Sequence, residues 1–166
     1  SELQAAVNAW CDDTAKVEAM IGKIANWDVS QIADMSNLFK RQPTCNPDLS
    51  EWNTGKVDDM MEMFYGATAF NGDLSKWDTG EVTNMMYMFY EATAFNGDLS
   101  KWDTGKVADM DSMFDGATSF NGDLSKWDTG EVADMGAMFY GATNFTNSTY
   151  CPPHPNANLV CPADPV

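Results

Sequence analysis

A 25-residue repeat constrains this chain more than any other feature of its sequence. Trp27, Trp52, Trp77, Trp102 and Trp127 stand 25 residues apart, and each opens a copy of one unit. The unit reads W-D-T-G-x-V-x-x-M-x-x-M-F-x-x-A-T-x-F-N-G-D-L-S-K. Tandem units of this length are typical of proteins in which each copy packs only on its neighbours. We therefore expect a short rod built from stacked units.

The repeat divides the 166 residues into three parts. Residues 27–150 hold five units, residues 1–26 precede them, and residues 151–166 follow as a Pro-rich segment. The first unit has R-Q-P-T-C at 41–45, and the last loses N-G-D-L-S-K after Phe145. Atypical end units are expected because the ends of a stack must face solvent or a cap. We assign 1–26 as an N-terminal helical cap and 151–166 as a C-terminal capping loop.

Within one unit, the pattern predicts one short helix and one short strand. Apolar residues in 82–92 recur at helical spacing, and residues 73–77 alternate weakly in strand fashion. The Asn-Gly pair at 71–72 is a strong turn signal. The sequence therefore predicts an α/β repeat solenoid, a right-handed leucine-rich-repeat-like stack of short parallel strands and short helices.

The unit resembles the BspA-like leucine-rich-repeat family of secreted and surface proteins. The resemblance rests on W-D-T-G at 77–80, on Met85, on Met88-Phe89 and on D-V-S at 28–30. The opening segment at 3–11 also resembles the helix that precedes such repeats. The resemblance implies an extracellular or cell-surface location, a binding or adhesive role and no catalytic residues. It leaves the segment from Cys151 unexplained.

The four cysteines lie in two groups, one near each end of the chain, and none belongs to a C-x-x-C pair. Of the three possible connectivities, position favours Cys11 with Cys45 and Cys151 with Cys161. Cys45 takes the place of the Phe found in later units, so the first bridge would tie the cap to the first unit. Leu3, Val7 and Trp10 share one face of the predicted cap helix.

Two N-glycosylation sequons begin at Asn144 and Asn147. Together with an even number of cysteines, they favour the secretory route. A first residue other than Met is consistent with a processed product. We expect a secreted, extracellular or cell-surface glycoprotein, with free buried thiols in a cytosolic protein as the alternative.

Charge and composition exclude several functions. The net charge is −16, with 9 Lys and Arg residues and one His, His154. The small number of cationic residues argues against nucleic-acid binding. A single His cannot form a multi-His metal site, and we expect no nucleophile paired with a His base. No apolar run is long enough to span a bilayer. We expect no enzyme activity and no cofactor.

Many of the acidic residues form rows of Asp, with one residue of each row in every repeat unit. The rows are Asp48, Asp73, Asp98, Asp123 and Asp28, Asn53, Asp78, Asp103, Asp128. Such residues cap turns by accepting backbone N–H bonds, which is the favoured interpretation. Stacked carboxylates that bind Ca²⁺ are the alternative.

One row of residues is not needed by the core. Tyrosines follow the core Phe in three units, and further large side chains lie nearby on the presumed exposed helical face. The candidate binding residues are Tyr65, Tyr90, Tyr140, Tyr87, Met61 and Met86. Clustered aromatic and Met side chains on a surface are typical of a contact site. The leading hypothesis is adhesion through this face to a protein or glycan; self-assembly into a filament or sheet is the alternative, and calcium binding is a third.

Overall fold

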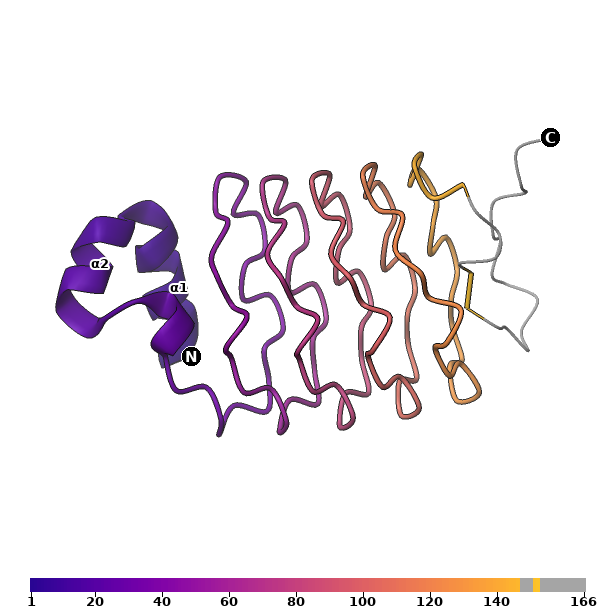
Figure 1. Cartoon of the computed structure of the whole chain (residues 1–166), viewed down its shortest axis with the longest axis horizontal. Helices are drawn as coiled ribbons and strands as arrows, with labels where there is room; N and C mark the ends of the chain where they lie inside the picture. Colours follow the sequence, from indigo (N-terminus) through magenta and orange to yellow (C-terminus); the bar gives the residue numbers. More distant parts are fainter. Residues whose placement is uncertain (147–150, 153–166) are drawn as a thin grey trace.

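The computed structural model describes residues 1–146, 151 and 152. The repeat units stack along the long axis of the molecule, and a helical segment covers the N-terminal end (Figure 1). We call the units rungs 1 to 5, beginning at Trp27, Trp52, Trp77, Trp102 and Trp127. Successive rungs follow the same path, so equivalent residues form rows along the stack.

The helical segment consists of α1 (Glu2–Asp12), α2 (Thr14–Ile21) and the 3-10 turn η1 (Ile24–Asn26). Ser1 caps α1 by accepting from the Gln4 N–H, and Asp13 caps α2 by accepting from the Lys16 N–H. Among the described residues, helix is confined to this segment. The predicted helix in each unit is therefore wrong.

Residues 82–92 form a run of turns that bonds to the next rung. The N–H groups of Met85, Tyr87, Phe89 and Glu91 donate to carbonyls of rung 4, at 2.7–2.9 Å. In the described chain the only β-pairing is a row of isolated parallel bridges, which joins Asp34, Asp59, Asn84, Asp109 and Asp134. The predicted α/β repeat solenoid with stacked strands is thus corrected to a stack of turns.

The physical reason lies in spacing and backbone conformation. Within the run, the Met88 N–H donates to Met85 and the Ala92 N–H donates to Phe89, each three residues back. A run of such turns repeats apolar side chains every three residues along the sequence, which resembles the three- and four-residue intervals of a helix. Tyr87 and Glu91 adopt φ of 56° and 53°, which no right-handed helix accommodates.

The predicted strand at 73–77 and the predicted Asn-Gly turn are also absent from these described residues. The Asn71 N–H instead donates to the Asn46 side chain, and the Asn71 side chain accepts from the Asn96 N–H. This asparagine ladder joins neighbouring rungs. A Cβ at Gly97 would stand 2.9 Å from the Phe95 ring, so glycine follows the asparagine because the chain passes directly over that ring.

Aromatic rows fill the core, as the sequence predicts. Trp77 and Trp102 are parallel, with centroids 6.4 Å apart, and Phe64 and Phe89 stack at 5.5 Å. Each of these Trp and Phe side chains is buried, together with the Leu, Val and Met rows. The Trp77 Nε1–H donates to the Leu49 carbonyl at 3.0 Å. The same bond recurs at each later Trp and crosses from rung to rung.

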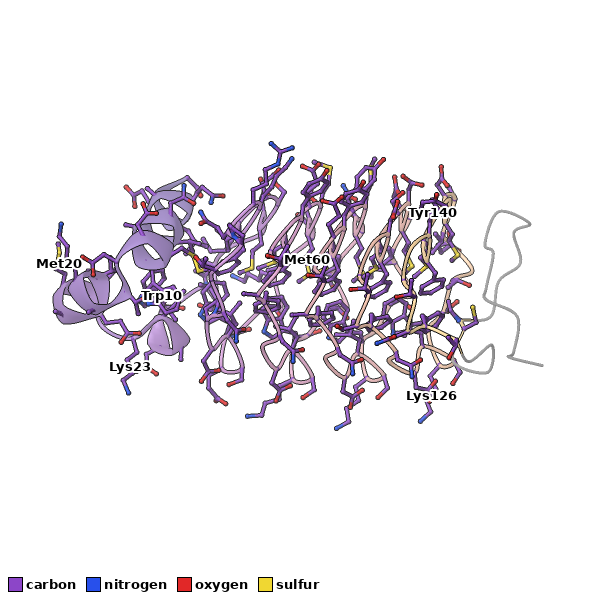
Figure 2. All side chains as sticks on the ribbon, turned by 90° about the horizontal axis from the view of Figure 1, so that it is seen from above. Trp10, Met20, Lys23, Met60, Lys126 and Tyr140 are labelled. Carbon is purple, nitrogen blue, oxygen red and sulfur yellow. A yellow bond between two sulfur atoms is a disulfide. The ribbon has the colours of Figure 1, made fainter. Side chains whose placement is uncertain are left out.

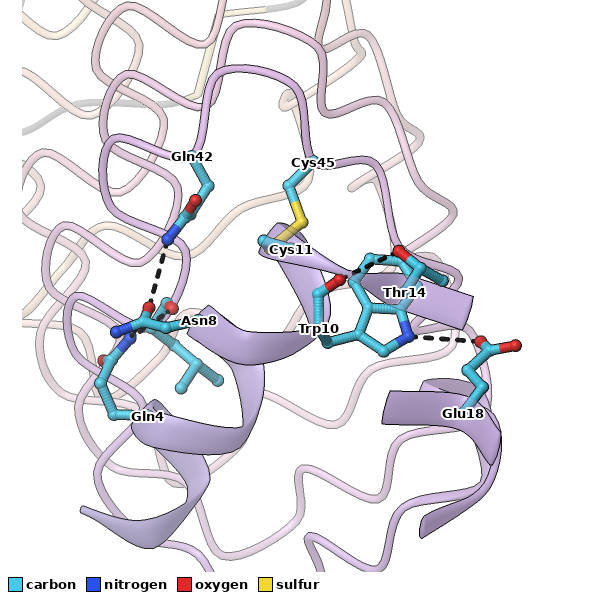
Figure 3. Close-up of a disulfide and its surroundings, with 9 residues drawn as sticks. Gln4, Asn8, Trp10, Cys11, Thr14, Glu18, Gln42 and Cys45 are labelled. Carbon is cyan, nitrogen blue, oxygen red and sulfur yellow. Dashed lines mark hydrogen bonds between the residues drawn. A yellow bond between two sulfur atoms is a disulfide. The ribbon is translucent and has the colours of Figure 1, made fainter. Parts of the chain in front are cut away.

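The N-terminal helices cover the first rung (Figure 3). Val7 and Trp10 are buried, Leu3 is half-buried against the core, and the Gln4 side chain donates to the Leu38 carbonyl at 2.8 Å. The predicted Cys11–Cys45 disulfide is confirmed. Cys161 lies outside the described residues, so its bridge to Cys151 stays a prediction.

Candidate binding face

Four neighbouring rows form one surface, which we call the Tyr face. Over rungs 1 to 4 the rows are Ser36, Met61, Met86, Asp111; Asn37, Glu62, Tyr87, Ser112; Lys40, Tyr65, Tyr90, Asp115; and Arg41, Gly66, Glu91, Gly116. The turn run of each rung supplies all four positions. Rung 5 continues the rows with Gly136, Ala137, Tyr140 and Gly141. Tyr140 lies on one edge of the stack and Lys126 on the opposite edge (Figure 2).

Three tyrosines form a continuous cluster at the centre of the Tyr face. Tyr65 and Tyr90 stack with centroids 4.6 Å apart, and Tyr87 lies edge-on to both, at 6.4 and 5.7 Å. All three are half-buried, as are Met61 and Met86. The structure therefore brings three of the six predicted binding residues into contact, and Met61 and Met86 lie in the same two rungs.

Tyr140 stands apart from that cluster. It is 75% exposed, and it has no ring contact with any described residue. The reason is the row itself, because Asp115 occupies the rung between Tyr90 and Tyr140 and interrupts the aromatic stack.

Cations lie at the N-terminal end of the Tyr face. The Lys40 Nζ lies 5.1 Å from the Tyr65 ring centroid, and the Arg41 guanidinium lies 5.8 Å from it. Lys40 also pairs with the Glu62 carboxylate. Arg41 is exposed and, within the described chain, forms no ion pair. Attraction of a cation to a ring face supports this arrangement.

Carboxylates lie at the other end of the Tyr face. Burial raises the pKa of Asp115, and repulsion from Glu91 and Asp111 raises it further. The pKa of Tyr87 is raised chiefly by its hydrogen bond with Asp111, which holds the phenol proton. Neighbouring Glu91, and then Asp115, raise the pKa of Tyr90. An added cation would stabilise this end of the Tyr face, because the negative charges there repel one another.

The charged ends of the Tyr face are not among the binding residues predicted from the sequence. Lys40 and Arg41 lie in the atypical first unit, where divergence was explained only by the cap. Asp111 and Asp115 replace the Met and Tyr of the preceding units. The signal was present, because each charge stands in the same row as the predicted aromatic and Met residues.

The Asp rows act as turn caps. Asp73 and Asp98 accept from the N–H groups of Ser75 and Ser100, at 2.9 Å, and Asp78 accepts from Gly80 at 3.1 Å. The Ser hydroxyl and backbone N–H lower the pKa of Asp98. In the part of the chain that the structure describes, no three His, Cys, Asp or Glu residues group as a metal site.

Of the two sequon asparagines, only Asn144 lies among the described residues. Asn144 is exposed, in rung 5, and its backbone N–H donates to the Thr118 carbonyl. Asn147 lies outside the described residues, as does His154. Glycosylation at either sequon stays a prediction.

Comparison with known proteins identifies the repeat. Residues 11–108 and 75–151 match the family described as "Mycoplasma protein of unknown function, DUF285", which is a BspA-like repeat family. No curated protein and no solved structure matches the chain. No helix among the residues described has the length and apolar character to cross a membrane. Since the matched segments span most of the sequence, the chain belongs to the DUF285 family.

Proposed function

We propose that this protein is a non-enzymatic binding module that docks another protein on the Tyr face. The observation that carries the proposal is the cluster of Tyr65, Tyr87 and Tyr90. Met61 and Met86 are half-buried in the neighbouring row of the same two rungs. The core is complete without these side chains, because the Trp, Phe, Leu and inner Met rows are buried independently of them. Tyr and Met are enriched at protein interfaces, where they supply contact area.

A protein partner fits this surface better than a glycan does. Tyr65 stacks on Tyr90, and the Lys40 and Arg41 cations lie over the Tyr65 ring, so its faces are engaged. The face therefore presents phenol edges, thioethers and charges of both signs. Such a mixture suits polar and apolar side chains of a protein, whose interfaces combine both.

The same proposal includes an extracellular or cell-surface location. Its support is the Cys11–Cys45 disulfide, since stable disulfides persist in oxidising compartments. The exposure of Asn144 is compatible with a glycan there. Mass spectrometry before and after deglycosylation of protein from a secretory host tests glycosylation, and an unmodified Asn144 would reject a glycan at that site.

A peptide selection tests the binding role. A phage-displayed random peptide library is selected against the wild-type chain, and the enriched peptides are synthesised. We expect these peptides to lose affinity for a Tyr65→Ser/Tyr90→Ser variant by more than tenfold. A Lys101→Ser/Lys126→Ser variant is the matched control because it changes exposed residues outside the Tyr face. Equal affinity for the wild-type and tyrosine variants, both with unchanged melting temperature, would reject the Tyr face.

A further inference from the structure

We propose that the partner of the Tyr face is a second copy of this chain, in a two-fold antiparallel dimer. The inference rests on the proposed function, because it names the occupant of the same surface. It follows from the order of residues along the four rows, which becomes complementary when one copy is reversed.

Symmetry limits how two copies can pack face to face. In a two-fold interface the same patch serves both subunits, and the axis lies in the plane between them. If the two-fold axis is perpendicular to the stack direction, the stacks of the two copies run antiparallel. Each row of one copy then faces the same row of the other copy. With the axis between rungs 2 and 3, rung 1 faces rung 4 and rung 2 faces rung 3.

The charges then match at both ends. Lys40 of each copy faces Asp115 of the other, and Arg41 lies opposite Gly116, beside Asp115 and Glu91. Among the described residues of its own copy, Arg41 forms no ion pair. At the acidic end, the pKa of the Asp115 carboxyl is raised. Opposite charges across an interface fix register and exclude wrong pairings.

The shapes of the rows match as well. Tyr65 faces Tyr90, Met61 faces Met86, and Glu62 faces Tyr87. In the outer row the two long side chains each meet a glycine, since Arg41 faces Gly116 and Glu91 faces Gly66. Within one copy the Arg41 side chain lies against Gly66 and the Glu91 side chain against Gly116, so each of these glycine positions presents a charge opposite to that of the side chain facing it.

Three other arrangements bring like charges together. With the axis through rung 3, Glu91 faces Glu91 of the other copy, and with the axis through rung 2, Glu62 faces Glu62. A parallel arrangement places Lys40 and Arg41 against the same cations. Like charges across an interface are unfavourable. Four overlapping rungs span about 19 Å at the spacing of stacked chains, so the contact is small and the dimer is of the weak, transient class.

Reciprocal charge reversal tests the dimer. Sedimentation equilibrium is measured over a concentration series for wild type, for Lys40→Glu/Arg41→Glu and for Asp111→Lys/Asp115→Lys. We expect wild type to dimerise and each variant alone to dissociate at least tenfold more readily, because like charges then face each other. An equimolar mixture of the two variants should regain the dimer, since every end pair becomes opposite in charge.

A Lys101→Glu/Lys126→Glu variant controls for the net charge of the Lys40→Glu/Arg41→Glu variant, because it makes the same change of charge outside the Tyr face, and it should dimerise like wild type. A wild-type chain that stays monomeric at every concentration would overturn the dimer, as would a mixture that stays monomeric. If wild type is monomeric yet selected peptides bind the Tyr face, the binding role survives and only the homodimer fails. If wild type dimerises regardless of both reversals, the copies associate through another surface and this inference fails.

Discussion

Trp77, the first residue of rung 3, donates its indole N–H to the buried backbone carbonyl of Leu49, near the end of rung 1, at 3.0 Å. The bond reaches back 28 residues, one repeat and three residues more, so it ties a core side chain to the backbone of the preceding turn of the stack. Because Trp52, Trp102 and Trp127 make the same bond, the stack is joined along its core as well as along its turns.

Replacing Trp77 with Phe should destabilise the chain by about 1–3 kcal/mol, since the Leu49 carbonyl would be left buried without its donor. Urea unfolding followed by circular dichroism measures the change. Trp27→Phe is the matched control, because Trp27 is half-buried and donates to Gly22 at the exposed cap. Equal losses for the two variants would show that the inter-rung bond adds nothing.

The disulfide between α1 and rung 1 should hold the cap on the stack. Cys11 and Cys45 are 34 residues apart, and a bridge of this span is worth about 2–4 kcal/mol. Cys11→Ser/Cys45→Ser should therefore melt at a lower temperature than wild type in calorimetry. A melting temperature that does not change would mean that Val7, Trp10 and the Gln4 bond suffice to hold the cap.

Replacing Gly97 with alanine should destabilise the folded chain. The added Cβ would lie 2.9 Å from two atoms of the buried Phe95 ring, and overpacking of this kind costs about 1–3 kcal/mol. Gly80→Ala is the comparison, because the nearest contact of its added Cβ is the Asp78 carboxylate at 3.4 Å, an ordinary van der Waals distance. Chemical unfolding of both variants tests the difference, and equal stabilities would contradict it.

Two aspartates should respond to pH with opposite signs. The pKa of Asp115 is raised above 3.8 by burial and by neighbouring carboxylates, so its favourable contribution exists at low pH and is lost as pH rises through the folded-state pKa. The pKa of Asp123 is lowered by the Ser125 hydroxyl and N–H, so its contribution exists above 3.8 and is lost as pH falls.

Asp115→Asn should therefore raise the free energy of unfolding at neutral pH, and Asp123→Asn should lower it. Both differences should shrink below the pH at which the carboxyls are protonated. Unfolding curves at neutral pH and near pH 3 measure them. Changes of the same sign at neutral pH would contradict the assigned causes.

The core and the cap could be read from the sequence, but the local backbone could not. Burial of the Trp and Phe rows, the face of α1 and the Cys11–Cys45 bridge follow from periodicity and position. The helix prediction failed because a run of turns repeats apolar side chains at the same spacing of three. The run differs from a helix in the positive φ at Tyr87 and Glu91 and in N–H bonds to the next rung, and neither residue type predicts these features.

The Asn-Gly prediction failed for a related reason. A pair such as Asn71-Gly72 favours a tight turn in an isolated segment, whereas here Asn71 bonds to the equivalent Asn of the neighbouring rungs. That partner exists only once the rungs are stacked. The aromatic rows predict the Tyr face, whereas similarity between units does not predict its charged ends, because Lys40, Arg41, Asp111 and Asp115 depart from the repeat.

The most direct test of the binding face uses the methyl groups of its methionines. The chain has 12 Met residues, of which Met61 and Met86 lie on the Tyr face and Met20 is 73% exposed on α2. Carbon-13 methyl-Met NMR is recorded during titration with a selected peptide. The account predicts that the Met61 and Met86 signals shift while Met20 does not. Saturable binding that shifts Met20 and leaves Met61 and Met86 unchanged would contradict it.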